Sequence, residues 1–236
     1  MKKGEGLYYK IARPDGWDFY TGSTINYRDA LGKTVVVPNP TMLPADLCSP
    51  GVLHASRLAE DCFQGGHIPC SLYRVQGTPI ISDDTKAGFL KMDVLQEIDP
   101  AVHFKWRYAE AANPMNLLLL PVPQVTPEDI ALLAAWASVR GSVWASVGDS
   151  VGDSVWDSVW ASVGDSVGDS VGDSVWDSVC AYTGWIFAPV IPKWRVEYPY
   201  QSAVDLWRRG LVPSYDGRVW RLHAGPSTQI VYAKTL

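Results

Sequence analysis

Hydrophobic and polar residues alternate along the first hundred residues in short runs that are separated by turn residues. Residues 6–13 (GLYYKIAR) predict a strand, and Pro14-Asp15-Gly16 predicts a turn, because proline presets φ and glycine accepts a positive φ. The run 17–21 (WDFYT) predicts the return strand of a hairpin. Further strands and one short helix are predicted at residues 34–37, 51–55, 58–63, 71–75 and 89–95. The pattern is typical of an α+β domain with a mostly antiparallel sheet.

From Ser138 to Ala181 the pattern changes to eleven consecutive four-residue units of the form Ser-Val-x-y. Position x holds Trp, Gly, Arg or Cys, and position y holds Asp, Ala or Gly. The residues found at each position can be related by single base changes in their codons. We therefore infer a twelve-nucleotide tandem repeat that expanded by slippage, and we expect its copy number to differ among relatives.

A long helix fits the repeat better than a strand. On a helix the valines form a continuous i,i+4 ridge, whereas on a strand each face would mix apolar side chains with Asp or Ser. Thr126 and Pro127 predict the start of a helix, and Thr183-Gly184 predicts its end. One helix is therefore expected over 127–183, with a β-solenoid or a disordered tract as the alternatives.

This predicted helix should not be stable alone, because its six glycines from 141 to 172 each cost roughly 1 kcal/mol relative to alanine. The four-residue period makes the valine ridge wind around the helix, so a flat surface cannot cover it. We expect the ridge to be buried against a second copy of the chain, with packing inside its own chain as the alternative. The expected self-association residues are Val143, Val147, Val151, Val155, Val159, Val163, Val167, Val171, Val175, Trp144, Trp156, Trp160 and Trp176.

The C-terminal residues predict a helix over 198–210 and a hairpin from strands at 218–223 and 229–233. This module is too small to fold independently, so we expect it to complete the N-terminal domain and the repeat helix to be an insertion. The predicted domains are an N-terminal α+β domain at 1–100, a Pro-rich linker at 101–125, the repeat segment at 126–184 and the helix-hairpin module at 185–236.

Charge and composition argue against several classes of partner. The chain has 20 Lys and Arg against 25 Asp and Glu, and it lacks the basic patch that nucleic-acid binding needs. No apolar run follows Met1, and the run 117–120 is too short to span a bilayer. Four cysteines do not form a disulfide framework in a chain of this length. We expect a cytoplasmic protein that binds neither nucleic acid nor membrane.

Five residues of types that bind zinc lie within 23 positions: Cys48, His54, Cys62, His67 and Cys70. Their spacing matches no compact zinc knuckle, and the segment contains no C-x2-C pair. We therefore predict buried thiols and a hydrogen-bonded histidine, and neither a metal nor a cofactor. If a metal site exists, these five residues are the candidates.

The strand around Phe19-Tyr20-Thr21-Gly22, the segment 51–56 (GVLHAS) and the last strand, which ends at Glu97, together resemble the ADP-ribosyltransferase fold. In that family a polar residue on one strand, an aromatic residue on a second and a late glutamate hold a nicotinamide cofactor. The resemblance implies His54 at the aromatic position and Glu97 as the acid. Tyr20-Thr21-Gly22 stands in place of the family's His-Gly-Thr-like signature.

The repeat, the N-terminal YKIARPDGWDFYTG and the segment 203–223 (AVDLWRRGLVPSYDGRVWRLH) resemble a family of uncharacterised proteins from phage and bacterial genomes. The resemblance covers most of the chain and implies a phage or mobile-element origin. Because no motif has tight catalytic spacing, we predict a non-enzymatic assembly or interaction protein that forms a homo-oligomer through the repeat. The alternative is an ADP-ribosyltransferase-like, nucleotide-handling enzyme.

Overall fold

The computed structural model describes residues 6–38, 47, 49–116, 119–148, 156–157, 159–160, 163 and 175–235. The chain divides into two compact units, Met1–Phe104 and Lys105–Leu236. Together they confirm the predicted α+β class, with one antiparallel sheet in each unit. The division differs from the expected one, because the repeat and the C-terminal module belong to the same unit.

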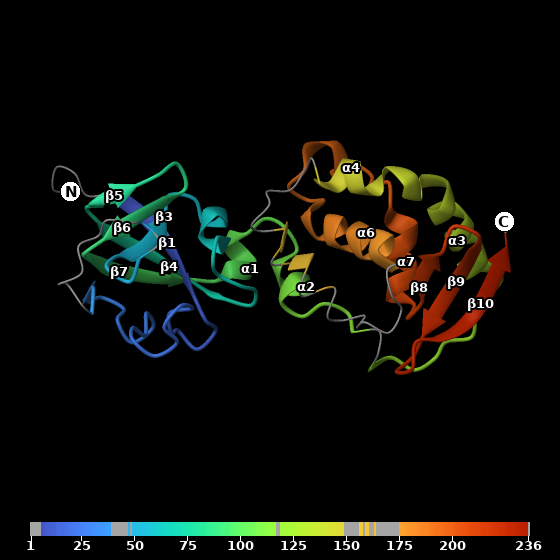
Figure 1. The fold of residues 1–236 in the computed structure, drawn as a ribbon, viewed down its shortest axis with the longest axis horizontal. Helices are drawn as coiled ribbons and strands as arrows, with labels where there is room; N and C mark the ends of the chain where they lie inside the picture. Colours follow the sequence, from blue (N-terminus) through green and yellow to red (C-terminus); the bar gives the residue numbers. More distant parts are fainter. Residues whose placement is uncertain are drawn as a thin grey trace. The chain divides into compact units, whose positions relative to one another are not determined.

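The first unit is built on a seven-stranded sheet in the order β2-β7-β4-β1-β3-β6-β5, with every neighbouring pair antiparallel (Figure 1). Its strands are β1 (Gly6–Ala12), β2 (Thr34–Val36), β3 (Leu53–Ser56), β4 (Ser71–Gly77), β5 (Ile81–Ser82), β6 (Lys86–Phe89) and β7 (Lys91–Ile98). Two short helices accompany them, η1 (Glu60–Phe63) and α1 (Pro100–His103).

Two local predictions for this unit are wrong. The predicted return strand at 17–21 does not pair with β1, whose partners are β3 and β4. Trp17 instead forms an isolated bridge with Asn26, because Asp18 and the glycines at 16 and 22 fold residues 13–27 into a compact loop. The single strand predicted at 89–95 is two strands, β6 and β7, that meet at Leu90.

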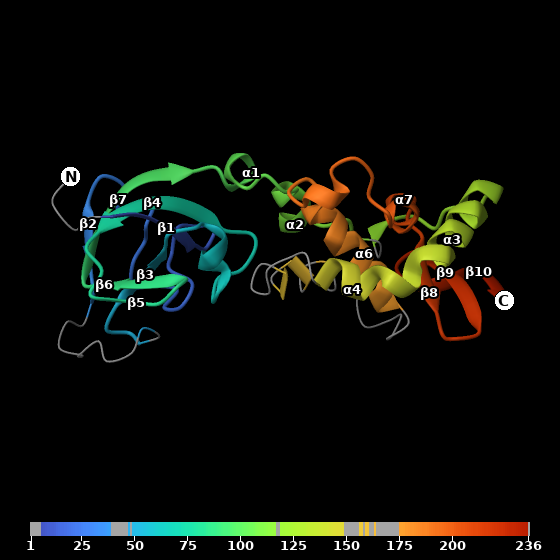
Figure 2. The ribbon, with the colours of Figure 1, turned by 90° about the horizontal axis from the view of Figure 1, so that it is seen from above.

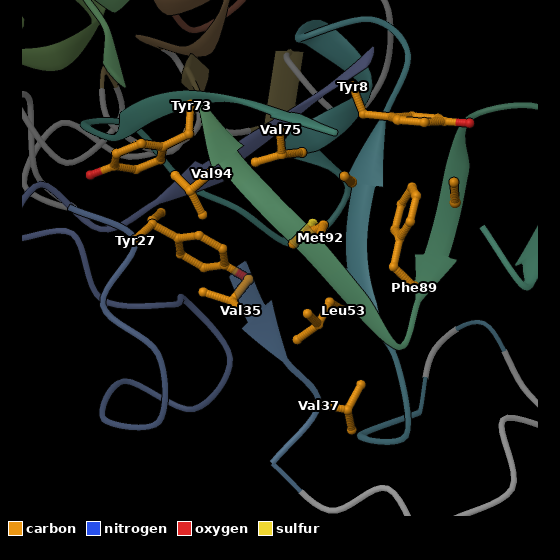
Figure 3. Packing of buried hydrophobic residues seen from close by; sticks show 13 residues of the cluster. Tyr8, Tyr27, Val35, Val37, Leu53, Tyr73, Val75, Phe89, Met92 and Val94 are labelled. Carbon is orange, nitrogen blue, oxygen red and sulfur yellow. The ribbon is translucent and has the colours of Figure 1, made fainter. Parts of the chain in front are cut away.

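The core of the first unit lies on one face of the sheet and is formed by aromatic and β-branched side chains (Figure 3). Tyr8 and Phe89 meet edge to face, with 4.9 Å between their ring centroids. Tyr73 and Val75 of the central strand β4 are fully buried in it. Burial of this kind is the main favourable term in folding, and it fixes which residues of β1 and β3 face the core.

The second unit combines helices with a three-stranded sheet in the order β10-β9-β8 (Figures 1 and 2). Its helices are α2 (Tyr108–Ala112), α3 (Pro127–Val139), η3 (Arg140–Ser142), α4 (Val143–Gly148), α6 (Trp176–Phe187), η6 (Pro192–Trp194) and α7 (Gln201–Arg208). Its strands are β8 (Val212–Tyr215), β9 (Val219–Ala224) and β10 (Gln229–Thr235).

The predicted start of the repeat helix is confirmed. The Thr126 hydroxyl accepts a hydrogen bond from the backbone N–H of Asp129, the Asp129 carboxylate accepts one from the backbone N–H of Thr126, and Pro127 is the first helical residue. This capping box fixes the entry into α3. Arg209 forms an ion pair with Asp129 at 3.1 Å and so joins this helix start to the end of α7.

The prediction of one uninterrupted helix over 127–183 is wrong. The helix gives way to the 3₁₀ turn η3 after Val139, and α4 and α6 lie side by side (Figures 1 and 2). A Cβ at Gly184 would lie 2.8 Å from a methyl group of Val147, so the two helices touch there. The chain folds back because its own α6 can cover the valine ridge of α4.

The C-terminal module also packs differently from the prediction. Helix α7 contacts α3 and α6, and the buried Trp207 stacks on Tyr182 of α6 with a centroid distance of 4.6 Å. The hairpin β9–β10 is confirmed, but its sheet is completed by β8 rather than by the N-terminal sheet. Because α7 exposes its polar face and buries Ala203, Val204 and Leu206, its apolar face needs the repeat-flanking helices as its partner.

One stretch in the described part of the chain, Pro127–Gly148, is long and apolar enough to cross a membrane by length and composition alone. Leu133, Trp136, Val143 and Val147 of this stretch are buried in the second unit, but only 22% of its most apolar window is buried. The expectation that the protein binds no membrane stays a prediction.

Candidate functional site

The first unit contains a cavity of about 420 Å³ beside the point where the sheet opens. β1 and β4 pair along seven positions from Gly6 to Ala12, whereas β1 and β3 pair only at Tyr9 and Ser56. Lys10 and Ile11 of β1 and residues 53–56 of β3 form the walls on either side of this opening, and residues 18–27 supply a third wall. The volume falls in the range of small-molecule sites.

A buried ion pair lies in the cavity wall. The ammonium of Lys10 binds the Asp18 carboxylate at 2.9 Å, and both side chains are about six-sevenths buried. The ammonium also lies 5.3 Å from the ring centroid of Tyr27. Burial alone would lower the pKa of Lys10, but Tyr27 and Asp18 hold that pKa above its ordinary range. Lys10 is therefore a permanent cation at neutral pH rather than a nucleophile.

Asp18 uses its other oxygen to hold the loop. Its Oδ1 accepts hydrogen bonds from the backbone N–H groups of Tyr20 at 3.0 Å and Thr21 at 3.2 Å. Burial alone would raise the pKa of Asp18, but Lys10 and these N–H groups lower it below the ordinary value. The carboxylate is thus fully engaged by the protein and fixes the part of the loop that carries Phe19 and Tyr20.

His54, to which the resemblance to ADP-ribosyltransferases assigned a cofactor-binding role, lines the cavity, and that role stays a prediction. It lies on β3 opposite Gly88 of β6. Its Nε2 is hydrogen-bonded to the carbonyl of Leu47, and burial lowers the pKa of the ring. The imidazole is therefore neutral at pH 7, with Nε2 as the donor and Nδ1 as an acceptor.

Cys62 and Lys86 complete the chemically active groups of the cavity. Burial raises the pKa of the Cys62 thiol to about 11. Its Sγ donates to the carbonyl of Tyr9 at 3.2 Å, so it is a weak donor rather than a reactive thiolate. The Lys86 ammonium donates to the carbonyl of Gln64 at 2.7 Å.

The structure does not bring Glu97 to this cavity, and Glu97 does not line it. Its carboxylate binds Arg28 at 2.8 Å and accepts a hydrogen bond from the Tyr73 hydroxyl at 3.4 Å. The cleft expected to contain both His54 and Glu97 therefore contains His54 with Asp18 as its acid. Glu97 has the environment of a partly exposed structural ion pair.

The five candidate zinc ligands are not brought together where they are described. His54 lies in the cavity, Cys62 binds the carbonyl of Tyr9, and the exposed His67 contacts Phe19 edge to face. Cys70 is buried, and Cys48 lies outside the described residues. Within the described ranges, no three His, Cys, Asp or Glu side chains are grouped so that they could hold a metal ion.

The described valines of the expected self-association surface are buried within one chain, whereas Trp144 of that surface is 49% exposed. The side chains of Val143, Val147, Val159, Val163 and Val175 are at most 2% exposed. These five valines are therefore buried within a single chain, and the expected self-association through the repeat stays a prediction. Val151, Val155, Val167 and Val171 lie outside the described residues.

The four tryptophans of the repeat form one cluster around Trp160. Its ring centroid lies 5.3 Å from Trp144, 5.4 Å from Trp156 and 5.3 Å from Trp176. The Trp144 indole N–H donates to Asp177 at 2.6 Å, and Arg140 pairs with the same carboxylate. These residues hold the two ends of the repeat together within the chain.

Three of these tryptophans, at positions 144, 160 and 176, are sixteen residues apart, which shows a period longer than four. The segments 138–153 and 154–169 are identical except at two positions, Arg140 against Trp156 and Gly141 against Asp157. The described valines follow the same spacing, with 143, 159 and 175 buried as one set and 147, 163 and 179 as another. The described valines and these three tryptophans of the repeat thus follow a sixteen-residue period.

No family model, curated protein or solved structure matches this chain. The resemblance to phage and bacterial proteins and the resemblance to ADP-ribosyltransferases therefore stay predictions. What the site can do follows from its own geometry.

The sequence patterns did not single out Lys10 and Asp18, the central residues of the site. Lys10 follows Tyr8 at an i,i+2 spacing on β1 and so shares the core-facing side of the strand. A lysine at a core position needs a buried acid as its partner. This rule could have indicated that Lys10 has an acidic partner. Asp18, just beyond the turn at 14–16, was an acid close to Lys10 in the sequence.

Proposed function

We propose that the first unit binds a small organic molecule in the cavity between β1, β3 and the loop 18–27. The observation that carries the proposal is the buried Lys10–Asp18 pair in the wall of a cavity of about 420 Å³. Burying a charged pair is costly compared with burying apolar residues of the same size. Such a pair is therefore common where a site needs fixed polar groups in an apolar surrounding.

The composition of the wall supports binding of an organic molecule rather than a free ion. Aromatic and aliphatic side chains from Phe19, Ile25 and Leu53 supply apolar contact, while Lys10, Ser56 and His54 supply a few polar atoms. An apolar wall with a few fixed donors and acceptors is typical of small-molecule sites.

Binding without chemistry is the function that these groups support best. Lys10 is held protonated, Cys62 is held as a neutral thiol, and the Asp18 carboxylate is saturated by Lys10 and two backbone N–H groups. None of the three is poised as a nucleophile or a general base at neutral pH.

The test uses Nile red, a neutral dye whose emission rises in apolar sites, with the full chain. Thr24 is exposed and lines the cavity mouth, so Thr24→Trp should fill the mouth and weaken dye binding by about tenfold or more. Gln96→Trp adds the same ring at an exposed position of β7 away from the cavity and should leave dye binding unchanged. Equal binding by both variants would overturn the proposal.

A further inference from the structure

Resting on the proposed function, we infer that the bound molecule combines a planar ring with one anionic group, a carboxylate or a phosphate. The charges of the cavity wall supply the first reason. Three described lining residues carry a formal charge at neutral pH, namely Lys10, Asp18 and Lys86. With His54 neutral, two cations and one anion leave the wall with a net charge of +1.

The two lysines differ in how their charge is compensated. The Lys10 ammonium is paired with Asp18 at 2.9 Å. The Lys86 ammonium donates to a neutral carbonyl, that of Gln64, at 2.7 Å, and no described carboxylate lies within ion-pair distance of it. Asp83, three residues before Lys86, accepts a hydrogen bond from the backbone N–H of Lys86 at 2.6 Å and interacts with the ammonium only through space. Among the described lining residues, Lys86 is therefore the cation that has no carboxylate within ion-pair distance.

An anionic group on the ligand would complete this arrangement. A charge-assisted hydrogen bond from an ammonium to a carboxylate or a phosphate is about twice as strong as one between neutral groups. The Lys86 ammonium is already oriented by the carbonyl of Gln64, so little side-chain freedom remains to be lost on binding. Carboxylate and phosphate share this chemistry, and the experiment distinguishes them.

The aromatic residues of the loop supply the second reason. Tyr20 is 86% exposed although its backbone N–H is fixed by Asp18, and it lines the cavity together with Phe19. The exposed ring of Tyr20 therefore offers an aromatic face beside the cavity. Aromatic faces favour planar rings in offset or edge-to-face contact. The ligand's ring would therefore lie against Tyr20 and Phe19.

The experiment is isothermal titration of the full chain with matched probes: 2-naphthoate, its neutral amide, its ammonium analogue 2-naphthylmethylamine, and naphthyl phosphate. We expect the two anions to bind about ten- to a hundredfold more tightly than the amide, and the amine more weakly still. The better of the two anions identifies the group that Lys86 recognises. Inorganic phosphate alone should bind far more weakly, because it lacks the ring.

Two variants assign the effect to Lys86. Lys86→Met should lower the affinity for 2-naphthoate to that for the amide, whereas Lys86→Arg should retain most of it. Lys91→Met is the control. It removes an exposed charge from β7 away from the cavity and should leave the affinity for 2-naphthoate unchanged. Amide and amine binding as tightly as the acids would overturn this inference and leave the cavity proposal standing. If Nile red binds but neither anion does, the inference of an anionic ligand is also overturned and the cavity proposal stands. If neither Nile red nor the anions bind, both the inference and the cavity proposal are overturned.

Discussion

The two units of the chain form their buried cores from opposite kinds of sequence. The first unit uses a varied sequence in which neighbouring residues have different tasks, and it leaves a cavity with a buried ion pair in its wall. The second unit uses a nearly uniform repeat, and its valines and tryptophans pack against one another inside one chain. A uniform sequence can build a core, whereas a binding site needs residues that occur once.

The contrast is also visible in the buried charges. Lys10 and Asp18 face a cavity, and each is needed to offset the burial of the other. In the second unit, Arg140–Asp177 and Arg209–Asp129 join one helix or turn to another. The first kind of pair places polar atoms where a ligand can meet them, and the second kind fixes the order of the helices.

The largest expected effect comes from breaking the ion pair of the first unit. Asp18→Asn leaves the Lys10 charge buried without its partner and should destabilise the first unit by about 3–5 kcal/mol. The double variant Lys10→Met with Asp18→Asn should recover much of this loss. Amide hydrogen exchange in β1 and β4 measures the first unit directly. An exchange rate unchanged by Asp18→Asn would mean that the pair contributes nothing.

A smaller effect is expected from the contact between α4 and α6. A Cβ at Gly184 would lie 2.5 Å from the Tyr198 hydroxyl oxygen and 2.8 Å from a Val147 methyl group, so Gly184→Ala should destabilise the second unit by about 1–3 kcal/mol. Gly141→Ala is the matched control, because a Cβ there would meet nothing within 4 Å, and it should be neutral or slightly stabilising.

The readout for this pair of variants is tryptophan fluorescence during urea unfolding. Ten of the eleven tryptophans lie in the second unit, since Trp17 is the one that precedes residue 105. The signal therefore follows that unit. If Gly184→Ala proved as stable as Gly141→Ala, the helices would not pack as described.

The acid stability of the first unit should depend on Asp18. The pKa of Asp18 is lowered in the folded state, so its contribution is present above the ordinary pKa of about 4 and is lost as the pH falls through the lowered value. The first unit should therefore lose stability in acid, and Asp18→Asn should flatten that part of its profile. Amide exchange of β1 at a series of pH values, corrected for the intrinsic rate, measures this. An identical acid profile in both proteins would contradict the assignment.

The smallest effect is expected at Glu97. Its pair with Arg28 is partly exposed, so Glu97→Gln should change the free energy of unfolding by less than about 1 kcal/mol. It should leave Nile red binding unchanged, because Glu97 does not line the cavity. Loss of binding in this variant would revive the enzyme alternative, in which Glu97 is the acid of the site.

The sequence predicted local structure better than it predicted long-range partners. The capping box at Thr126, the strand β1 and the hairpin β9–β10 depend on residues close in the chain, and these predictions are confirmed. The partner of the valine ridge depends on whether the chain can fold back, which a four-residue period does not disclose. The sixteen-residue period could have been found by aligning 138–153 with 154–169, and it would have favoured packing within the chain.

The candidate site was predicted only in part for the same reason. His54 was singled out and lines the cavity, but Glu97 was expected beside it and binds Arg28 instead. The cavity exists because β1 and β3 separate after one paired position, and no pattern of hydrophobic residues specifies such an opening. Lys10 and Asp18 became recognisable as a pair once the loop 13–27 was known to fold back on β1.

The central claim is that the cavity of the first unit binds a ligand, whereas the repeat of the second unit builds a core. Its most direct test is amide hydrogen exchange of the full chain with and without saturating 2-naphthoate. The account predicts slower exchange at residues 18–27 and 53–56, which line the cavity, and unchanged exchange at 127–148 and 175–187. Protection confined to the helices of the second unit would contradict it, because binding would then belong to the repeat and not to the cavity.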